Sequence, residues 1–144
     1  MNIGIASSIF ANVAVAGTCE VNVEATVAMA FNLKEITVPK TCKEITINLK
    51  NTGTMAKAMM GHNLVISKTS DMQAVLSDGM AAGLDNNYLK PKDARVIGNT
   101  DIIGGGEATS VKIKLNNVKS SDAYSFFCSF PGHSAVMKGL FKLV

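Results

Sequence analysis

The chain has 144 residues and a formal net charge of +3, with 47% hydrophobic and 17% charged side chains. This length suits one domain, and the composition favours a folded globular protein over a disordered one. Basic residues are scattered and aromatic residues are few, so we expect no nucleic-acid-binding surface.

The first sixteen residues, "MNIGIASSIFANVAVA", carry no charged side chain and end in the small-x-small pattern Ala14-Val15-Ala16. This is typical of a secretory signal peptide, and the run is too short to span a bilayer, so no membrane span is expected. The Lys or Arg that normally begins such a peptide is missing, which leaves an added first strand as the alternative. We expect a signal peptide or leader over 1–16, a single domain over 17–144 and a periplasmic location.

Cysteine usage also favours export. Cys19 and Cys42 flank a predicted strand near the expected mature terminus, whereas Cys128 lies far along the chain. In an oxidising compartment the first two could form a disulfide that stabilises the fold by about 3 kcal/mol. Three cysteines allow other pairings, so the residues alone leave the pairing open.

After the leader, the chain contains short runs in which apolar and polar residues alternate. In "CEVNVEATV", Val21 and Val23 alternate with Asn22 and Glu24, and similar runs follow in "EITINLKN", "HNLVISK", "SVKIKLNNV", "AYSFFCSF" and "LFKLV". Alternation with period two, with Gly and Asn between the runs, predicts an antiparallel sandwich or barrel.

One segment, "SDMQAVLSDGMAAGL", breaks this rhythm. Ser70 and Gln73 have the spacing of a capping box, and apolar residues recur near helical spacing at Met72, Val75, Leu76 and Met80. Glycines interrupt the pattern, so we predict one short helix inserted between strands.

The stretch "CSFPGHSAVM" places Cys128, His133 and Met137 in one short loop. Thiolate, imidazole and thioether donors together suit copper, and two histidines with one cysteine and a weak methionine make a blue-copper site. The only other histidine is His62, at the start of the predicted strand in "MMGHNLVIS". A sandwich can bring His62 to the same end as the Cys–His loop, so the sequence predicts one copper site.

Other uses of these residues fit less well. A catalytic Cys/His pair needs a third group to orient the base, and structural zinc sites generally lack methionine. A copper enzyme such as a nitrite reductase would need further histidines, and none remain. A copper chaperone or storage protein could use the same ligands and stays open as the alternative function.

The stretches "CSFPGHSAVMKG", "MMGHNLVIS" and "DMQAVLSDGMAAGLDNNYLKPKDARVIG", together with the Cys19/Cys42 pair, resemble the azurin family of small bacterial blue-copper proteins. The resemblance covers residues 18–144. It implies an all-β, Greek-key β-sandwich of the cupredoxin type with one short inserted helix, and a Cys19–Cys42 disulfide. It also implies one type 1 copper ion held by His62, Cys128 and His133, with Met137 as a long axial ligand and the Gly61 carbonyl opposite it.

The function that the resemblance implies is a periplasmic carrier of single electrons, not an enzyme, that works by outer-sphere transfer between transient redox partner proteins. Asn63 would tie the two ligand loops together, and the N–H groups of Asn63 and Phe130 would point at the Cys128 sulfur. His133 would be the exit for electrons, within an apolar docking patch formed by Met29, Met55, Met60, Met80, Pro131, Gly132 and Ala135.

Three positions depart from the family pattern. Leu64 stands where azurins commonly have a tryptophan inside the barrel, and Asn51 and Asn99 stand where non-ligand histidines often occur. Because no free imidazole then titrates near the metal, we expect a reduction potential that is nearly constant from about pH 5 to pH 8.

Overall fold

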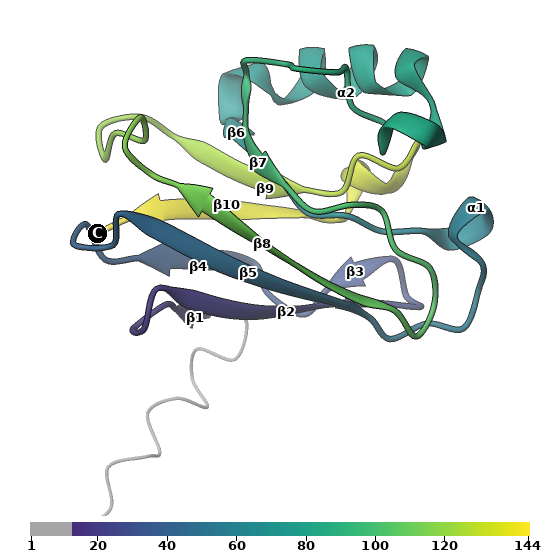
Figure 1. Cartoon of the computed structure of the whole chain (residues 1–144), viewed down its shortest axis with the longest axis horizontal. Helices are drawn as coiled ribbons and strands as arrows, with labels where there is room; N and C mark the ends of the chain where they lie inside the picture. The colour runs from purple at the N-terminus through teal and green to yellow at the C-terminus, as the bar shows by residue number, and fades with distance from the viewer. Residues whose placement is uncertain (1–12) are drawn as a thin grey trace, which may run out of the picture.

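The computed structural model describes residues 13–144 as two β-sheets packed face to face (Figure 1). One sheet has six strands, in the spatial order β1 (Val13–Val15), β4 (Glu35–Val38), β10 (Lys138–Leu143), β9 (Tyr124–Phe127), β6 (Val65–Lys68) and β7 (Val96–Asn99). The other has four, in the order β3 (Ala30–Phe31), β2 (Glu20–Thr26), β5 (Glu44–Asn51) and β8 (Ala108–Lys114). The predicted all-β sandwich of Greek-key type is confirmed.

The expectation of purely antiparallel pairing is wrong at three places. Strand β2 pairs with β5 in parallel, as do β4 with β10 and β1 with β4. Between β2 and β5 the chain crosses into the six-stranded sheet to form β4. The chain then returns to the four-stranded sheet as β5, which runs in the same direction as β2, so β2 and β5 pair in parallel.

The main core lies between the two sheets. Alternate residues of β2 and β5 point into it, which explains their alternating pattern in the sequence. Leu64, at the position where a tryptophan is common, is fully buried in this core together with Phe126 and Phe141.

The predicted inserted helix is present as α2 (Met72–Ala82), which follows a short 3₁₀ turn, η2 (Thr69–Asp71). It covers the outer face of the six-stranded sheet, where Val65 and Phe127 pack against Met72, Val75 and Leu89. Strands β6 and β9 are therefore buried on both faces. The expected capping box does not form, because the helix begins after Asp71 and no side chain caps its N-terminus. A second helix of one turn, α1 (Lys57–Met60), was not expected from the sequence.

Cys19 and Cys42 form a disulfide with their Cα atoms 5.7 Å apart, and Cys128 is free and buried. The pairing implied by the family resemblance is therefore confirmed.

Residues 1–12 lie outside the described part of the chain, and Val13–Val15 pair with β4, so the leader over 1–16 and the domain boundary stay predictions. Within the described residues, the helices are too short or too polar to cross a bilayer.

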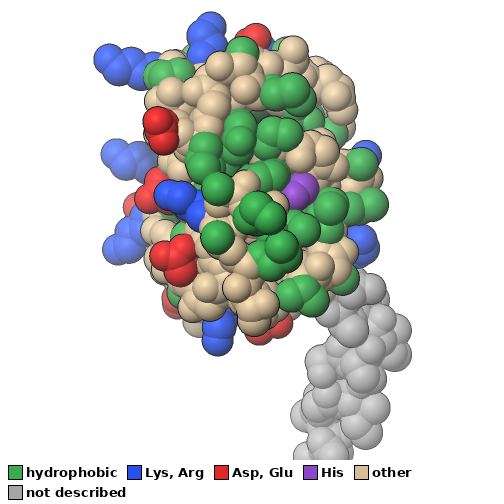
Figure 2. Space-filling model, turned by 90° about the vertical axis from the view of Figure 1, so that its right-hand side faces the viewer, with side chains coloured by type: hydrophobic (Ala, Val, Ile, Leu, Met, Phe, Trp, Pro, Cys, Tyr) green, Lys and Arg blue, Asp and Glu red, His purple; other side chains and the backbone are tan. Residues whose placement is uncertain are grey.

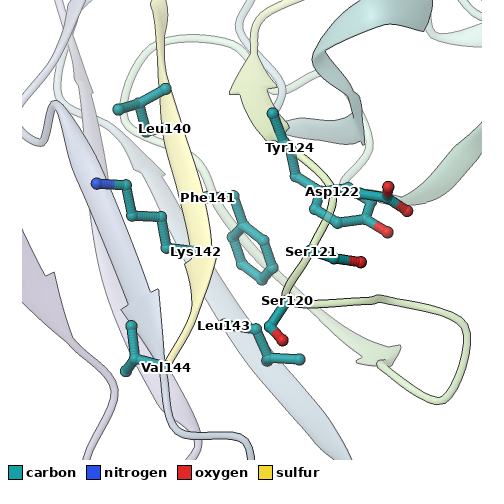
Figure 3. A pocket seen from close by; sticks show the side chains of 10 residues that line it. Ser120, Ser121, Asp122, Tyr124, Leu140, Phe141, Lys142, Leu143 and Val144 are labelled. Atoms are coloured by element: carbon teal, nitrogen blue, oxygen red, sulfur yellow. The ribbon is translucent and has the colours of Figure 1, made fainter.

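The end of the sandwich that carries the C-terminus has an open hollow of about 330 Å³ (Figure 3). Phe141 and Tyr124 form its apolar wall, and Ser120, Ser121 and Asp122 lie along its rim. Within residues 13–144, however, the group of three or more His, Cys or carboxylate donors close enough to share an ion lies elsewhere. The hollow is therefore not the candidate site.

Candidate metal centre

Two separated segments place His62, Cys128 and His133 at one end of the sandwich. His62 lies between α1 and β6, and its backbone pairs with that of Ile103 through hydrogen bonds of 3.1 and 2.9 Å. Cys128 directly follows β9, and His133 begins the short 3₁₀ turn η4 (His133–Ala135). The loops that carry them meet beside α1, at the right-hand end of Figure 1.

The three side chains converge closely enough to share one ion. Their donor atoms lie within 4.8 Å of one another, and the Cys128 sulfur is 4.0 Å from Nδ1 of His62 and 3.7 Å from Nδ1 of His133. For a first-row metal such as zinc, bonds to sulfur and to nitrogen are about 2.3 and 2.0 Å long. One ion can therefore contact the sulfur and both nitrogens, so the donors fit a metal of this size.

Backbone hydrogen bonds close the C-terminal ligand loop on itself. Cys128 donates its N–H to the carbonyl of Met137 at 3.1 Å, and Met137 donates its own to the carbonyl of His133 at 2.8 Å. The buried Met137 is thereby held beside both residues. In the other loop, a Cβ at Gly61 would lie only 2.5 Å from the carbonyl oxygen of Lys57. The backbone at residue 61 can therefore pack this closely against that of Lys57 only because residue 61 is glycine.

A buried polar network joins the two ligand loops. Asn63, next to His62, accepts the backbone N–H of Ser129 at 2.8 Å and donates to the Ser129 hydroxyl at 2.9 Å. The Ser129 hydroxyl donates in turn to the carbonyl of Asn87 at 3.0 Å. The geometry gives Asn63 the connecting position that the family resemblance implies. Ser129 was missed, although a hydroxyl directly after Cys128 and beside the apolar Phe126, Phe127 and Phe130 was an available signal.

Both histidines are neutral at pH 7. Burial, together with a smaller repulsion from His133, lowers the pKa of His62 to about 4, and a backbone interaction with Thr26 acts weakly in the opposite direction. That interaction falls short of a well-formed hydrogen bond, because the buried Nε2 of His62 has no partner of good geometry within residues 13–144. Burial also lowers the pKa of His133. The ring nitrogens are therefore free of the protons that would block a metal.

The cysteine behaves in the opposite way. Burial raises the pKa of the Cys128 thiol to about 11, although the backbone N–H groups of Asn63 and Phe130 favour the thiolate. A buried thiolate thus needs a cation beside it, and a bound metal ion supplies that charge. Two neutral imidazoles and one buried thiol form a soft donor set suited to copper.

His133 reaches the surface inside an apolar patch. It keeps 4% of its surface exposed, whereas His62 has none, and the Phe130 ring stacks on it with centroids 4.4 Å apart. Figure 2, which faces this end of the molecule, shows hydrophobic side chains gathered around a small area of histidine. Four apolar side chains at this end are prominently exposed: Met59 (65%), Met80 (58%), Val136 (52%) and Met55 (44%).

The predicted patch residues differ in exposure. Met55, Met80, Gly132 and Ala135 are exposed, Met60 and Pro131 are half-buried, and Met29 packs against the main core. Met59 and Val136 were missed by the sequence reasoning. Their positions, one residue from the predicted Met60 and inside the His133–Met137 loop, were the available signals.

Comparisons with known proteins agree with this centre. A model of the family described as copper binding proteins, plastocyanin/azurin family, matches residues 17–144. Azurin-1 of Alcaligenes xylosoxydans xylosoxydans is 54% identical over 126 residues, which cover 88% of this chain and 98% of that protein. Azurin of Alcaligenes faecalis is 55% identical over 125 residues, which cover 87% of this chain and 98% of that protein.

A solved structure, that of the azurin Az-iso2 from Methylomonas sp. strain J, is similar over nearly the whole described chain. It superposes with a TM-score of 0.85 at 44% identity, covering 89% of this chain and 99% of that one. The fold, the donor set and the sequence relatives all lead to the same assignment. The chain belongs to the azurins of the plastocyanin/azurin family, and its cofactor is copper.

Proposed function

We propose that this protein is a periplasmic carrier of single electrons between transient redox partner proteins, and not an enzyme. His62, Cys128 and His133 would hold one copper ion, with Met137 as a long axial ligand and the Gly61 carbonyl opposite it. Bound copper supplies the Cu(I)/Cu(II) couple for one-electron chemistry. The periplasmic location is supported by the predicted leader and by the Cys19–Cys42 disulfide, which needs an oxidising compartment.

The observation that carries this proposal is the burial of all three donors, with only the edge of His133 at the surface. Three protein donors with two weaker axial groups leave no open position for a substrate, which disfavours hydrolytic or oxygen chemistry. The hydrogen-bonded loops hold the donors in one arrangement. Little reorganisation on gain or loss of an electron favours outer-sphere transfer.

His133 is the proposed exit for electrons. Its ring is the donor nearest to solvent, and hydrophobic side chains surround it at the surface (Figure 2). An apolar surface without fixed ion pairs allows a partner to approach closely and to leave quickly. Methionine is well suited to this, because its flexible side chain repacks against different surfaces.

The backbone N–H groups of Asn63 and Phe130 would tune the centre. Both favour negative charge on the Cys128 sulfur. Hydrogen bonds to a thiolate reduce the charge it donates to the metal, so they raise the reduction potential.

The first experiment is to add Cu(II) to the purified metal-free protein and to record the visible spectrum. We expect an intense thiolate-to-copper charge-transfer band, and we expect the Cys128→Ser variant to lack it. A Cys19→Ala, Cys42→Ala double variant serves as the matched control, because it removes cysteines far from the centre and should keep the colour. A band that persists in Cys128→Ser would overturn the ligand assignment.

A second experiment separates the carrier from a copper chaperone. A carrier retains its copper through repeated reduction and reoxidation and exchanges electrons reversibly at an electrode. A chaperone transfers Cu(I) to a competing acceptor within the time of mixing. Rapid loss of Cu(I) to a moderate chelator would favour the chaperone.

A further inference from the structure

Two consecutive residues beyond the inserted helix adopt an unusual backbone. Asn87 and Tyr88, which follow the 3₁₀ turn η3 (Leu84–Asn86), have φ angles of 57° and 51°. This left-handed conformation is uncommon for residues other than glycine, and two in succession are held only where surrounding contacts fix them. The contacts of this pair lead to the metal centre.

The backbone carbonyl of Asn87 touches both ligand loops. It accepts hydrogen bonds from the side-chain amide of Asn63 at 3.3 Å and from the hydroxyl of Ser129 at 3.0 Å. Asn63 directly follows His62, and Ser129 directly follows Cys128. One carbonyl outside the ligand loops therefore fixes the neighbours of two ligands.

The side chain of Asn87 reaches a third segment. Its amide donates to the carboxylate of Asp101 at 3.0 Å, and its oxygen accepts the backbone N–H of Ile102, also at 3.0 Å. The next residue, Ile103, forms the two-bond backbone pair with His62. Asn87 thus holds the strand partner of His62 as well as the ligand loops themselves.

Tyr88 extends the contact to the remaining ligand. Its ring packs edge-on against Phe130, with centroids 5.3 Å apart and an interplanar angle of 68°, and Phe130 stacks on His133. Helix α2 packs directly against the backbone of Tyr88. A Cβ at the buried Gly79 would overlap the carbonyl oxygen of Tyr88, so the helix fits there only because residue 79 is glycine.

We propose that Asn87 and Tyr88 are positioning residues of the metal centre, through which the inserted segment 69–95 holds the two ligand loops and the segment 101–103 that pairs with His62. The inference rests on the proposed function, because it assigns this pair a role in holding the copper ligands. Neither residue is proposed to touch the metal. They act through Asn63, Ser129 and Phe130, in the way that outer partners fix the orientation of metal ligands.

Asn87→Gly tests the side-chain link without disturbing the backbone, since glycine adopts the left-handed conformation and keeps the carbonyl. Asn86→Gly is the matched control, because the exposed Asn86 side chain bonds to the carbonyl of Ala82, 2.9 Å away in the same segment. We expect Asn87→Gly to release Cu(II) to a chelator about tenfold faster than wild type and to change the copper hyperfine splitting in the EPR spectrum. Asn86→Gly is expected to change neither.

A rescue variant separates positioning from general damage to the fold. Asn87→Asp sets a carboxylate against that of Asp101, and we expect faster copper release and an altered EPR spectrum. Adding Asp101→Asn restores a donor–acceptor pair between the two positions, and we expect the wild-type release rate and spectrum to return. Urea unfolding of each metal-free variant measures stability separately.

Each result bears on one claim. If wild type forms the blue centre but Asn87→Gly and Asn87→Asp keep its release rate and EPR spectrum, the positioning role is overturned. It is also overturned if these variants lose stability alone, with no spectroscopic change. If wild type itself forms no blue centre with Cu(II), the proposed function fails instead.

Discussion

The two ends of the sandwich are held together by different means. At the end with the C-terminus, the Cys19–Cys42 disulfide ties the start of β2 to the residues just before β5, and Leu143 lies close by. At the metal end, buried hydrogen bonds among Asn63, Ser129 and Asn87 make the connection. A disulfide stabilises mainly by restricting the unfolded chain, whereas a buried polar network specifies one native arrangement. The disulfide therefore contributes to stability alone, whereas the polar network at the other end also sets the ligand geometry.

Removing the disulfide should have the largest effect on stability and little effect on the metal. For Cys19→Ala with Cys42→Ala, we expect the free energy of unfolding of the metal-free protein to fall by about 3 kcal/mol, as loop closure over this separation predicts. Urea unfolding measures this loss. The visible spectrum and reduction potential should stay unchanged, and a shift in either would contradict the separation of roles.

Breaking the polar network should affect both properties. Asn63→Leu leaves the buried N–H of Ser129 without its acceptor, and we expect a loss of about 2 kcal/mol in unfolding free energy together with an altered copper band. Asn48→Leu is the control, because its bonds to Glu20 and Asn22 lie on the exposed face of β5. We expect a change within about 0.5 kcal/mol and an unaltered band there. Equal effects at both positions would show that the network has no special role.

A positive charge added at one end or the other should show which end is the docking surface for electron exchange. Met59→Lys puts a like charge on both copies of an encounter pair, and we expect electron exchange between two copies to slow about tenfold at low ionic strength. High salt should restore most of the rate. Val144→Lys, at the opposite end, should leave the rate unchanged, and NMR line broadening in mixtures of oxidised and reduced protein measures it. Equal slowing by both variants would point to net charge instead of docking.

Copper binding should release about one proton at pH 7. The lowered pKa values of His62 and His133 leave both rings neutral, whereas the raised pKa of Cys128 keeps the thiol protonated until metal enters. Titration with Cu(II) in weakly buffered solution, followed with a pH indicator, counts the protons. Below pH 5 the count should rise, because metal-free His62 gains a proton with a pKa of about 4. A release of two or more protons at pH 7 would mean that a histidine is charged there.

The smallest expected effect is on the reduction potential. Asn51 and Asn99 cannot titrate, and the chain has no histidine beyond His62 and His133. A fully proton-coupled step would change the potential by about 59 mV per pH unit. We expect voltammetry between about pH 5 and pH 8 to give a slope close to zero. A steep slope would reveal a titrating group that neither the sequence nor the site provides.

Much of the fold could be predicted from the sequence, for a physical reason. Strands β2 and β5 bury one face only, so their residues alternate and the strands are visible in the pattern. Strands β6 and β9 are covered on their second face by α2, which removes the alternation. The parallel pairing of β2 with β5 depends on a crossover between sheets, which no local pattern encodes.

The candidate donors were also predictable, because two histidines, one unpaired cysteine and a nearby methionine leave few combinations. The proposed positioning residues could not be predicted in this way. Asn87 and Tyr88 look like ordinary loop residues, and only tertiary contacts set their left-handed backbone. Likewise, the turn of α1 decides that Met59 faces solvent while Met60 is half-buried, and adjacent methionines give no sign of this.

The packing of Tyr88 on Phe130 has an optical consequence. The chain has no tryptophan and two tyrosines, and the second, Tyr124, lines the hollow at the far end, where its hydroxyl accepts the N–H of Lys119 at 3.0 Å. Ultraviolet emission therefore arises from one phenol ring at each pole of the molecule. In Tyr124→Phe the remaining emitter is Tyr88, whose fluorescence would report metal binding. In Tyr88→Phe the remaining emitter is Tyr124, whose fluorescence would report local unfolding at the end that carries the disulfide.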